Sequence, residues 1–174
     1  MFPLIHFTDA PLGLCNEMLA EWGHKMGPIH RGNQTGWNYA LYHDGRPVAI
    51  AMANTLIAER VGGTEIELTR KNTIELSRLC AARPGLCRVA LRLWREFVFP
   101  PLGYQYAMSY QDAVLHNGDT YRFDGWKRVG YSASGTDTRS GRTGRKKYVW
   151  LWEKRSNTGM ALQQEAPCTV LQGF

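Results

Sequence analysis

Two segments of the chain carry apolar side chains at helical spacing. Before the first, Asp9 is placed to cap a helix with Pro11 in its first turn, and Gly23 ends the pattern. The second segment, residues 86–99, is amphipathic and is stopped by the prolines that follow it. The apolar positions are Leu12, Leu14, Cys15, Met18, Leu19 and Trp22 in the first helix, and Leu86, Val89, Ala90, Leu93, Trp94 and Phe97 in the second.

Other segments have the apolar alternation or the β-branched and aromatic content of strands. Residues 37–42 and 47–53 predict a hairpin, because the Asp44-Gly45 pair between them is a strong turn signal. Residues 73–80 alternate as a half-buried strand does. Further strands are predicted over 104–110, 126–131 and 147–152, a short strand or loop edge over 65–68, and a short helix over 119–123.

This order of elements predicts an α/β (α+β) fold, in which helices cover a mixed sheet. A chain of 174 residues suits one domain with its own core, and we place that domain at residues 1–155. Residues 23–36 and 132–145 are rich in glycine and polar side chains, as connecting loops are. Residues 156–174 have weak patterns and form a tail that is a candidate for partial disorder.

Positive charge is concentrated near the end of this domain. Residues 1–121 carry 11 basic and 11 acidic side chains, whereas residues 122–155 carry 10 basic and 3 acidic ones. Such a tract favours a polyanion, because neutralised phosphates release condensed counterions; a solvated loop is the alternative. The candidate phosphate contacts are Arg139, Arg142, Arg145, Lys146 and Lys147.

Several classes of protein are disfavoured. No apolar run approaches the ~20 residues of a membrane span, and the N-terminus lacks the pattern of a secretory signal. The four cysteines form no Cys-x-x-Cys pair, so we expect free thiols in a reducing cytoplasm rather than a structural zinc site.

The stretch from Ser109 to Trp126 gathers side chains that move protons. Asp112, His116 and Tyr121 fall within ten positions, with the basic tract close behind. Each has a structural alternative: Asp112 can cap a turn, His116 can be a loop residue without a role, and Tyr121 can pack on Trp126.

The element order and these motifs resemble the Gcn5-related N-acetyltransferase fold. In that fold the loop and helix after the middle strand bind the pyrophosphate of acyl-coenzyme A, and Glu75-Leu76-Ser77-Arg78-Leu79 followed by helix 86–99 occupies this place. The resemblance makes Ser77, Arg78, Arg83, Gly85 and Arg88 candidates for donor binding. The loop departs from the family's Gly-rich pattern by keeping a single glycine, so fewer N–H groups can cradle a pyrophosphate.

A narrower resemblance links the chain to the Mom family of bacteriophage proteins, which share the acetyltransferase fold and modify DNA adenine. It rests on Glu75-Leu76-Ser77-Arg78-Leu79, Ser109-Tyr110-Gln111-Asp112, His116-x-Gly118-x-x-Tyr121 and Gly125-Trp126, and runs with gaps over residues 15–131. It implies conversion of the adenine amine to a carbamoylmethyl form, in the cytoplasm of an infected bacterial cell, which protects phage DNA from restriction. The family's His-Tyr pair near the N-terminus becomes His24-Lys25 here.

The resemblance gives the candidate residues their roles. Asp112 would accept a proton from the adenine N6 amine, and Tyr121 would donate one to the leaving group. His116 would orient Asp112 or contact phosphate, and His24 would act as a base or a metal ligand, unless it is a surface residue at a helix end. Ser77 and Arg78, as strand neighbours, are expected on opposite faces, with one in the site and the other pairing with Glu75 or Glu67, unless both are plain sheet structure.

The sequence alone leaves the group donor, the need for a metal and the acceptor undecided. The donor is acyl-coenzyme A or an aminoacyl-tRNA, the second of which suits the basic surface. The set His24, His30, Asp112 and Tyr121 has the ligand character of an iron or zinc site, although no spacing requires a metal. Reaching N6 in a duplex requires extrusion of the base, with Trp37, Trp126 or Tyr110 as stacking surfaces. The alternatives are an acyltransferase for a hypermodified pyrimidine, a protein or a small amine, and a nucleic-acid-binding module without catalysis. A monomer and a homodimer are equally compatible with the sequence.

Overall fold

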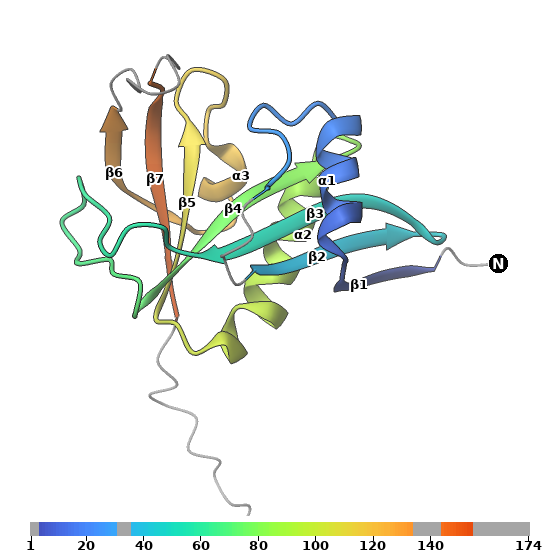
Figure 1. The fold of residues 1–174 in the computed structure, drawn as a ribbon, viewed down its shortest axis with the longest axis horizontal. Coiled ribbons are helices and arrows are strands. Elements are labelled where there is room, and N and C mark those ends of the chain that lie inside the picture. Colours follow the sequence, from blue (N-terminus) through green and yellow to red (C-terminus); the bar gives the residue numbers. More distant parts are fainter. Residues whose placement is uncertain (1–3, 31–35, 134–143, 155–174) are drawn as a thin grey trace, which may run out of the picture.

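Seven strands form one sheet in the computed structural model, which describes residues 4–30, 36–133 and 144–154 (Figure 1). The spatial order is β1-β2-β3-β4-β5-β7-β6, and every neighbouring pair is antiparallel except β4 and β5. The strands are β1 (Ile5–Asp9), β2 (Gly36–His43), β3 (Arg46–Thr55), β4 (Thr73–Ala81), β5 (Tyr106–Asp112), β6 (Lys127–Ala133) and β7 (Lys146–Glu153).

Helices cover both faces of this sheet (Figure 1). They are α1 (Leu12–Glu21), α2 (Leu86–Leu93), a π-helical turn η1 (Trp94–Val98), a 3₁₀ turn η2 (Pro100–Leu102) and α3 (Asp119–Arg122). The alternation along β3 divides the core. Ala51 and Ala53 pack towards α2 and η1, and Ile50 and Met52 pack towards α1. No helix within the described ranges combines the length and the apolarity needed to cross a bilayer.

The hairpin of β2 and β3, the strands β4 to β7 and the short helix α3 confirm the predicted elements. The N-terminal strand β1 was not predicted. It is an edge strand whose residues are exposed or half-buried, so its alternation is weak. Asp9 is therefore the last residue of β1 rather than a helix cap, and Pro11 is the N-cap of α1. Residues 65–68 lie in a loop beside the isolated bridge Arg60↔Thr69.

The predicted helix 86–99 contains an irregular turn. The Phe99 N–H donates to the Trp94 carbonyl, five residues back, and this wider turn shifts the side chains that follow around the helix axis. Phe97, predicted on the buried stripe, is exposed, whereas Arg95 is buried. Val89, also predicted on that stripe, is exposed too, but it precedes the wider turn, which therefore does not account for it. Such π-turns leave no periodic signal in a single sequence.

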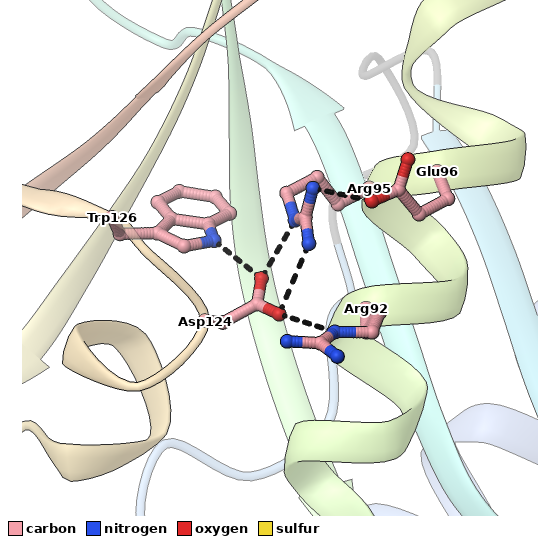
Figure 2. Close-up of polar contacts among 5 residues, drawn as sticks. All are labelled: Arg92, Arg95, Glu96, Asp124 and Trp126. Carbon is pink, nitrogen blue, oxygen red and sulfur yellow. Dashed lines mark hydrogen bonds and ion pairs between the residues drawn. The ribbon is translucent and has the colours of Figure 1, made fainter.

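The inward turn of Arg95 creates a buried ionic cluster (Figure 2). The fully buried Asp124 carboxylate accepts hydrogen bonds from Arg95 Nε at 2.8 Å, from Arg92 Nε at 3.1 Å and from the Trp126 indole N–H at 3.1 Å. Arg95 also pairs with Glu96 and lies 4.0 Å over the Trp152 ring. The cluster fastens α2 and η1 to the turn between α3 and β6, and thereby fixes where α3 lies.

The sheet opens between β4 and β5. The two strands pair from Thr73↔Tyr106 to Glu75↔Met108 and then separate, with α3 near the opening (Figure 1). A β-bulge lies in β4 at the same level, because Leu76 is paired with Ala53 and Arg78 with Met52, so that Ser77 is the extra residue. The break in pairing leaves room for a cavity between the two strands.

Candidate active site

A cavity of about 240 Å³ lies where β4 and β5 separate. It is built from the loop after α1, the middle of β4, the first turn of α2, the end of β5, the segment from Leu115 to Tyr121 and the start of β7. Among its lining residues are Asp112, His116, Tyr121, His24, Ser77, Arg78, Tyr110, Arg145 and Lys147. The structure therefore brings together the four candidate catalytic residues, including His24, which is far from the others in sequence.

Tyr121 is held in an aromatic stack at the base of this cavity. Its ring stacks on Trp150 at 5.6 Å and meets Trp126 edge-on at 5.5 Å. Its hydroxyl lies 2.8 Å from Ser109 Oγ, which donates to the Leu76 carbonyl at 2.8 Å. Because the Ser109 proton is used there, Tyr121 donates to Ser109. Burial raises the pKa of Tyr121 to about 12, so the hydroxyl keeps its proton at neutral pH.

Asp112 ends β5 and caps the turn that follows. Its Oδ1 accepts hydrogen bonds from the N–H groups of Val114 at 2.9 Å and Leu115 at 3.1 Å. Burial alone would raise its pKa, but these two bonds and the charges of Arg145 and His116 outweigh burial and lower it. Asp112 therefore caps a turn, which was the structural alternative to a catalytic role, and it also lines the cavity as a carboxylate.

His24 follows α1 and is turned into the cavity. Burial, the charge of Arg78 and the proximity of His116 lower its pKa from 6.5 to about 4, so the ring is neutral at pH 7. The Met26 N–H donates to Nδ1 at 3.3 Å. In the neutral ring the proton is then on Nε2, which makes His24 a hydrogen-bond donor rather than a base.

The lowered pKa of His24 predicts how stability depends on pH. Between pH 6.5 and about 4 the unfolded chain binds a proton that the folded chain does not, so stability falls as the pH falls through this window. In urea unfolding, the wild-type protein is expected to lose more stability between pH 7.5 and pH 5 than His24→Gln. His43→Gln, at an exposed site outside the cavity, should behave as wild type. Equal losses in wild type and His24→Gln would contradict the prediction.

Gly118 lets the segment between His116 and Tyr121 pass closely over the aromatic stack. It is the N-cap of α3 at φ +82°, and an added Cβ would lie 2.5 Å from Trp150 Cζ2 and 2.7 Å from Gln111 Oε1. These two side chains are hydrogen-bonded to each other, because the Trp150 Nε1–H donates to Gln111 Oε1 at 2.7 Å. The position therefore requires glycine both for its backbone angle and for its space.

We expect Gly118→Ala to lower the free energy of unfolding by about 2–4 kcal/mol, from left-handed backbone strain and overpacking together. Gly103→Ala is the matched control, because Gly103 has φ +79° but open space around it. That control should lose only about 1–2 kcal/mol, the backbone part. Equal losses at both positions in urea unfolding would show that the close approach at Gly118 costs nothing.

Ser77 and Arg78 do not face opposite sides as predicted, since both line the cavity. The β-bulge at Ser77 breaks the strict alternation of β4. Ser77 Oγ donates to the Met52 carbonyl and lies 2.6 Å from Asn54 Oδ1, while Arg78 Nε donates to the Gly27 carbonyl at 3.0 Å. Glu67, one of the partners predicted for this strand, pairs with Arg60 at 3.5 Å. Arg78 thus braces the loop that carries His24.

The proposed donor side lies at the start of α2. Gly85 caps this helix at φ +86°, and Arg83 and Arg88 are exposed on either side of it. Cys87, in the first turn, reaches the cavity, and burial raises the pKa of its thiol to about 11. The first turn of a helix presents N–H groups to anions, which suits a phosphate of either candidate donor. Sequence reasoning missed Cys87 and Ser109 as lining residues.

The proposed four-residue metal set is not assembled. His30 lines a neighbouring cavity rather than the one that holds His24, Asp112 and Tyr121. Among residues 4–30, 36–133 and 144–154, no three His, Cys, Asp or Glu side chains lie close enough to hold a metal ion. The described side chains thus do not fit an iron site, and no step below depends on one.

The basic tract reaches the rim of the cavity. Arg145 and Lys147 line it, and Lys146 is exposed beside them at the start of β7. Arg139 and Arg142 lie outside the described residues.

Of the three aromatic stacking candidates, Tyr110 is on the cavity and 36% exposed, with Lys147 Nζ 5.4 Å from its ring centre. Trp126 is wrong as a stacking surface because it is buried, and Trp37 is half-buried against Tyr104.

The sequence matches no protein-family model and no curated protein. Several solved structures share the fold. The ribosomal-protein-S18-alanine N-acetyltransferase from Escherichia coli is 11% identical with a TM-score of 0.59, over 89% of this chain and 98% of its own. NAA60 from Arabidopsis thaliana, solved with acetyl-CoA, is 10% identical with a TM-score of 0.60, over 87% and 100%. The aminoglycoside acetyltransferase AAC(6')-Ib with coenzyme A is 14% identical with a TM-score of 0.59, over 87% and 95%. At these identities the likeness shows the fold, and the chain has the Gcn5-related N-acetyltransferase fold that its sequence predicts.

Proposed function

We propose that the protein is an acyltransferase-type enzyme that modifies the N6 amine of adenine in DNA, as the resemblance to the Mom family implies. One observation carries the proposal. The cavity between β4 and β5 holds a neutral histidine, a protonated tyrosine and an ionised aspartate, with the start of α2 at one side and basic side chains at its rim. This set can bind an acyl donor, an amine and a phosphate backbone at once.

The proton movements follow from the side chains. The neutral N6 amine attacks the donor carbonyl, and the nitrogen then carries a proton that is strongly acidic. Asp112 can accept it directly or through water, since even a carboxylate of lowered pKa is basic enough for this step. His24 Nε2–H is suited to stabilising the negative charge that develops on the carbonyl oxygen. Tyr121 turns its O–H away from Ser109 to protonate the leaving sulfur or oxygen.

Both donors remain candidates. Acyl-coenzyme A is favoured by the fold, since two of the three solved structures named above carry coenzyme A or acetyl-CoA. An aminoacyl-tRNA would supply a glycyl group, and its phosphates would suit Arg83 and Arg88 beside α2. Direct transfer of that group forms the N6–C(O) bond, releases the tRNA hydroxyl and gives a glycyl amide, which is an isomer of the carbamoylmethyl form. The acceptor adenine enters from DNA, and its extrusion costs a few kcal/mol that phosphate contacts offset. In a phage-infected bacterial cell such a base would resist restriction.

Reconstitution with separate donors tests the proposal. Purified protein is incubated with adenine-containing DNA and with either acetyl-CoA or glycyl-tRNA, each carrying a labelled acyl group. Transfer of label to DNA adenine from one of them is expected, and the productive donor is thereby identified. Asp112→Ala should lose transfer, whereas Asp9→Ala, at the end of edge strand β1, should keep it. Absence of label on DNA with both donors would overturn the proposal.

A second function is favoured by the solved neighbours, whose names give a protein alanine and aminoglycosides as acceptors. A protein or small amine could enter the same cavity and use the same proton transfers. If a protein or a small amine is added to the reconstitution as a second acceptor, label on that acceptor but not on DNA would identify this activity. Binding of nucleic acid without any transfer would instead identify a module that has lost catalysis.

A further inference from the structure

A second, larger cleft of about 570 Å³ adjoins the candidate active site. The walls that this cleft does not share with the active site come from the loop after α1 and from the segment that follows β3, residues 56–62. The two spaces share six lining residues, so they are continuous: Met26, Glu75, Ser77, Arg78, Tyr110 and Lys147. None of the described residues that line the second cleft belongs to α2. The cleft therefore opens away from the side where we place the donor.

The charge of this cleft suits an anionic chain. Its lining includes the cationic side chains Arg60, Arg78 and Lys147 together with His30, and Glu75 is the one acid among its described lining residues. The lining also includes apolar and aromatic side chains, of which Ile57 is 58% exposed and Tyr110 is 36% exposed. A positively charged groove combined with aromatic side chains is the arrangement with which proteins bind single-stranded nucleic acid.

The segment that carries Arg60 is held in place by hydrogen bonds within the protein, before any ligand binds. Arg70 Nε donates to the Leu56 carbonyl at 3.0 Å, another nitrogen of its guanidinium donates to the Ile57 carbonyl, and Arg70 pairs with Glu59 at 2.8 Å. Arg60 forms an exposed pair with Glu67 at 3.5 Å, which is weak enough to be exchanged for a phosphate. A cation on a preordered loop loses little conformational entropy on binding a ligand.

We propose that this second cleft binds the DNA strand that flanks the target adenine, with Arg60 and Lys147 at its phosphates and Tyr110 at the junction with the active site. The inference rests on the proposed function and adds where the acceptor strand runs. The cleft lies on the sheet face that α1 covers. The start of α2, where we place the phosphates of the donor, lies on the opposite face of the sheet. The cleft is therefore better placed for the DNA acceptor than for the tRNA of a donor.

Binding of a single-stranded adenine-containing oligonucleotide at several salt concentrations tests this without catalysis. Each phosphate contact contributes about 0.7 to the slope of log affinity against log salt on single strands. We expect Arg60→Gln and Lys147→Gln each to lower the slope by about 0.7 and to weaken binding several-fold. Arg46→Gln, an exposed arginine at the start of β3 that lines neither cavity, should bind as wild type.

The outcomes separate this inference from the proposed chemistry. If Arg60→Gln lowers the slope although reconstitution modifies no DNA, the strand site stands and the proposed reaction fails. If DNA is modified but Arg60→Gln has the slope of wild type and Arg46→Gln, the inference is overturned. It is also overturned if Arg60→Gln leaves oligonucleotide binding intact and instead raises the KM for glycyl-tRNA, because the cleft would then hold the donor.

Discussion

Tyr121→Phe is expected to lower the turnover number for group transfer by about 10²–10⁴-fold, the usual contribution of a general acid. The ring remains stacked on Trp150 and edge-on to Trp126, so the cavity keeps its shape. Ser109 still donates to the Leu76 carbonyl, so no buried donor is left without a partner and the free energy of unfolding should change by only about 1 kcal/mol. Single-turnover kinetics with saturating donor and DNA measure the effect.

The control for this prediction is Tyr131→Phe, at an exposed tyrosine on β6 that does not line the cavity. It should keep the wild-type turnover number. If Tyr121→Phe also keeps it while remaining folded, Tyr121 is not the proton donor, and its hydroxyl serves only to join α3 to β5 through Ser109.

Asp124→Ala is expected to lower the free energy of unfolding by about 3–5 kcal/mol, because removing one partner of a buried ion pair leaves the other charge uncompensated. Here the buried Arg95 guanidinium loses its hydrogen bonds to Asp124 and keeps the pair with the more exposed Glu96, while the Trp126 N–H loses its acceptor (Figure 2). Arg92, which is mostly exposed, can turn to water and adds little to the loss. The midpoint and slope of urea unfolding measure the change.

Asp119→Ala is the matched control for Asp124→Ala. Asp119 also pairs with an arginine, Arg122, but on the exposed surface of α3, so its loss should cost about 0–1 kcal/mol. Equal losses in the two variants would mean that the cluster of Asp124 contributes no more than a surface pair. In that case the position of α3, and with it that of Tyr121, would be set by the aromatic stack alone.

Much of the fold could be predicted because periodicity and turn chemistry are local. The Asp44-Gly45 turn fixes the hairpin of β2 and β3, and the alternation of residues 73–80 places β4. Two features depend on distant partners and leave no such pattern. Strand β1 forms because it pairs with the free edge of β2. Arg95 points inward because it bonds to the carboxylate of Asp124, which lies 29 residues later in the sequence.

The candidate site was predicted in part for the same reason. Asp112, His116 and Tyr121 lie together because one short segment follows β5, and that proximity is visible in the sequence. The placement of Cys87 and Ser109 on the cavity depends on where β4 and β5 separate, which only the sheet determines. The bulge at Ser77 likewise reverses the expectation for Ser77 and Arg78, since a single extra residue shifts the phase of a strand.

The central claim is that this site modifies adenine in DNA, and mass spectrometry of nucleosides tests it most directly. DNA is prepared from bacterial cells that express the wild-type protein or Tyr121→Phe, and is digested to nucleosides. A glycyl amide and a carbamoylmethyl group on N6 have the same mass, so fragment spectra and synthetic standards must distinguish them. We predict a modified deoxyadenosine in the wild-type sample that is strongly reduced in Tyr121→Phe. Unmodified deoxyadenosine in both samples, with folded protein present, would contradict the account.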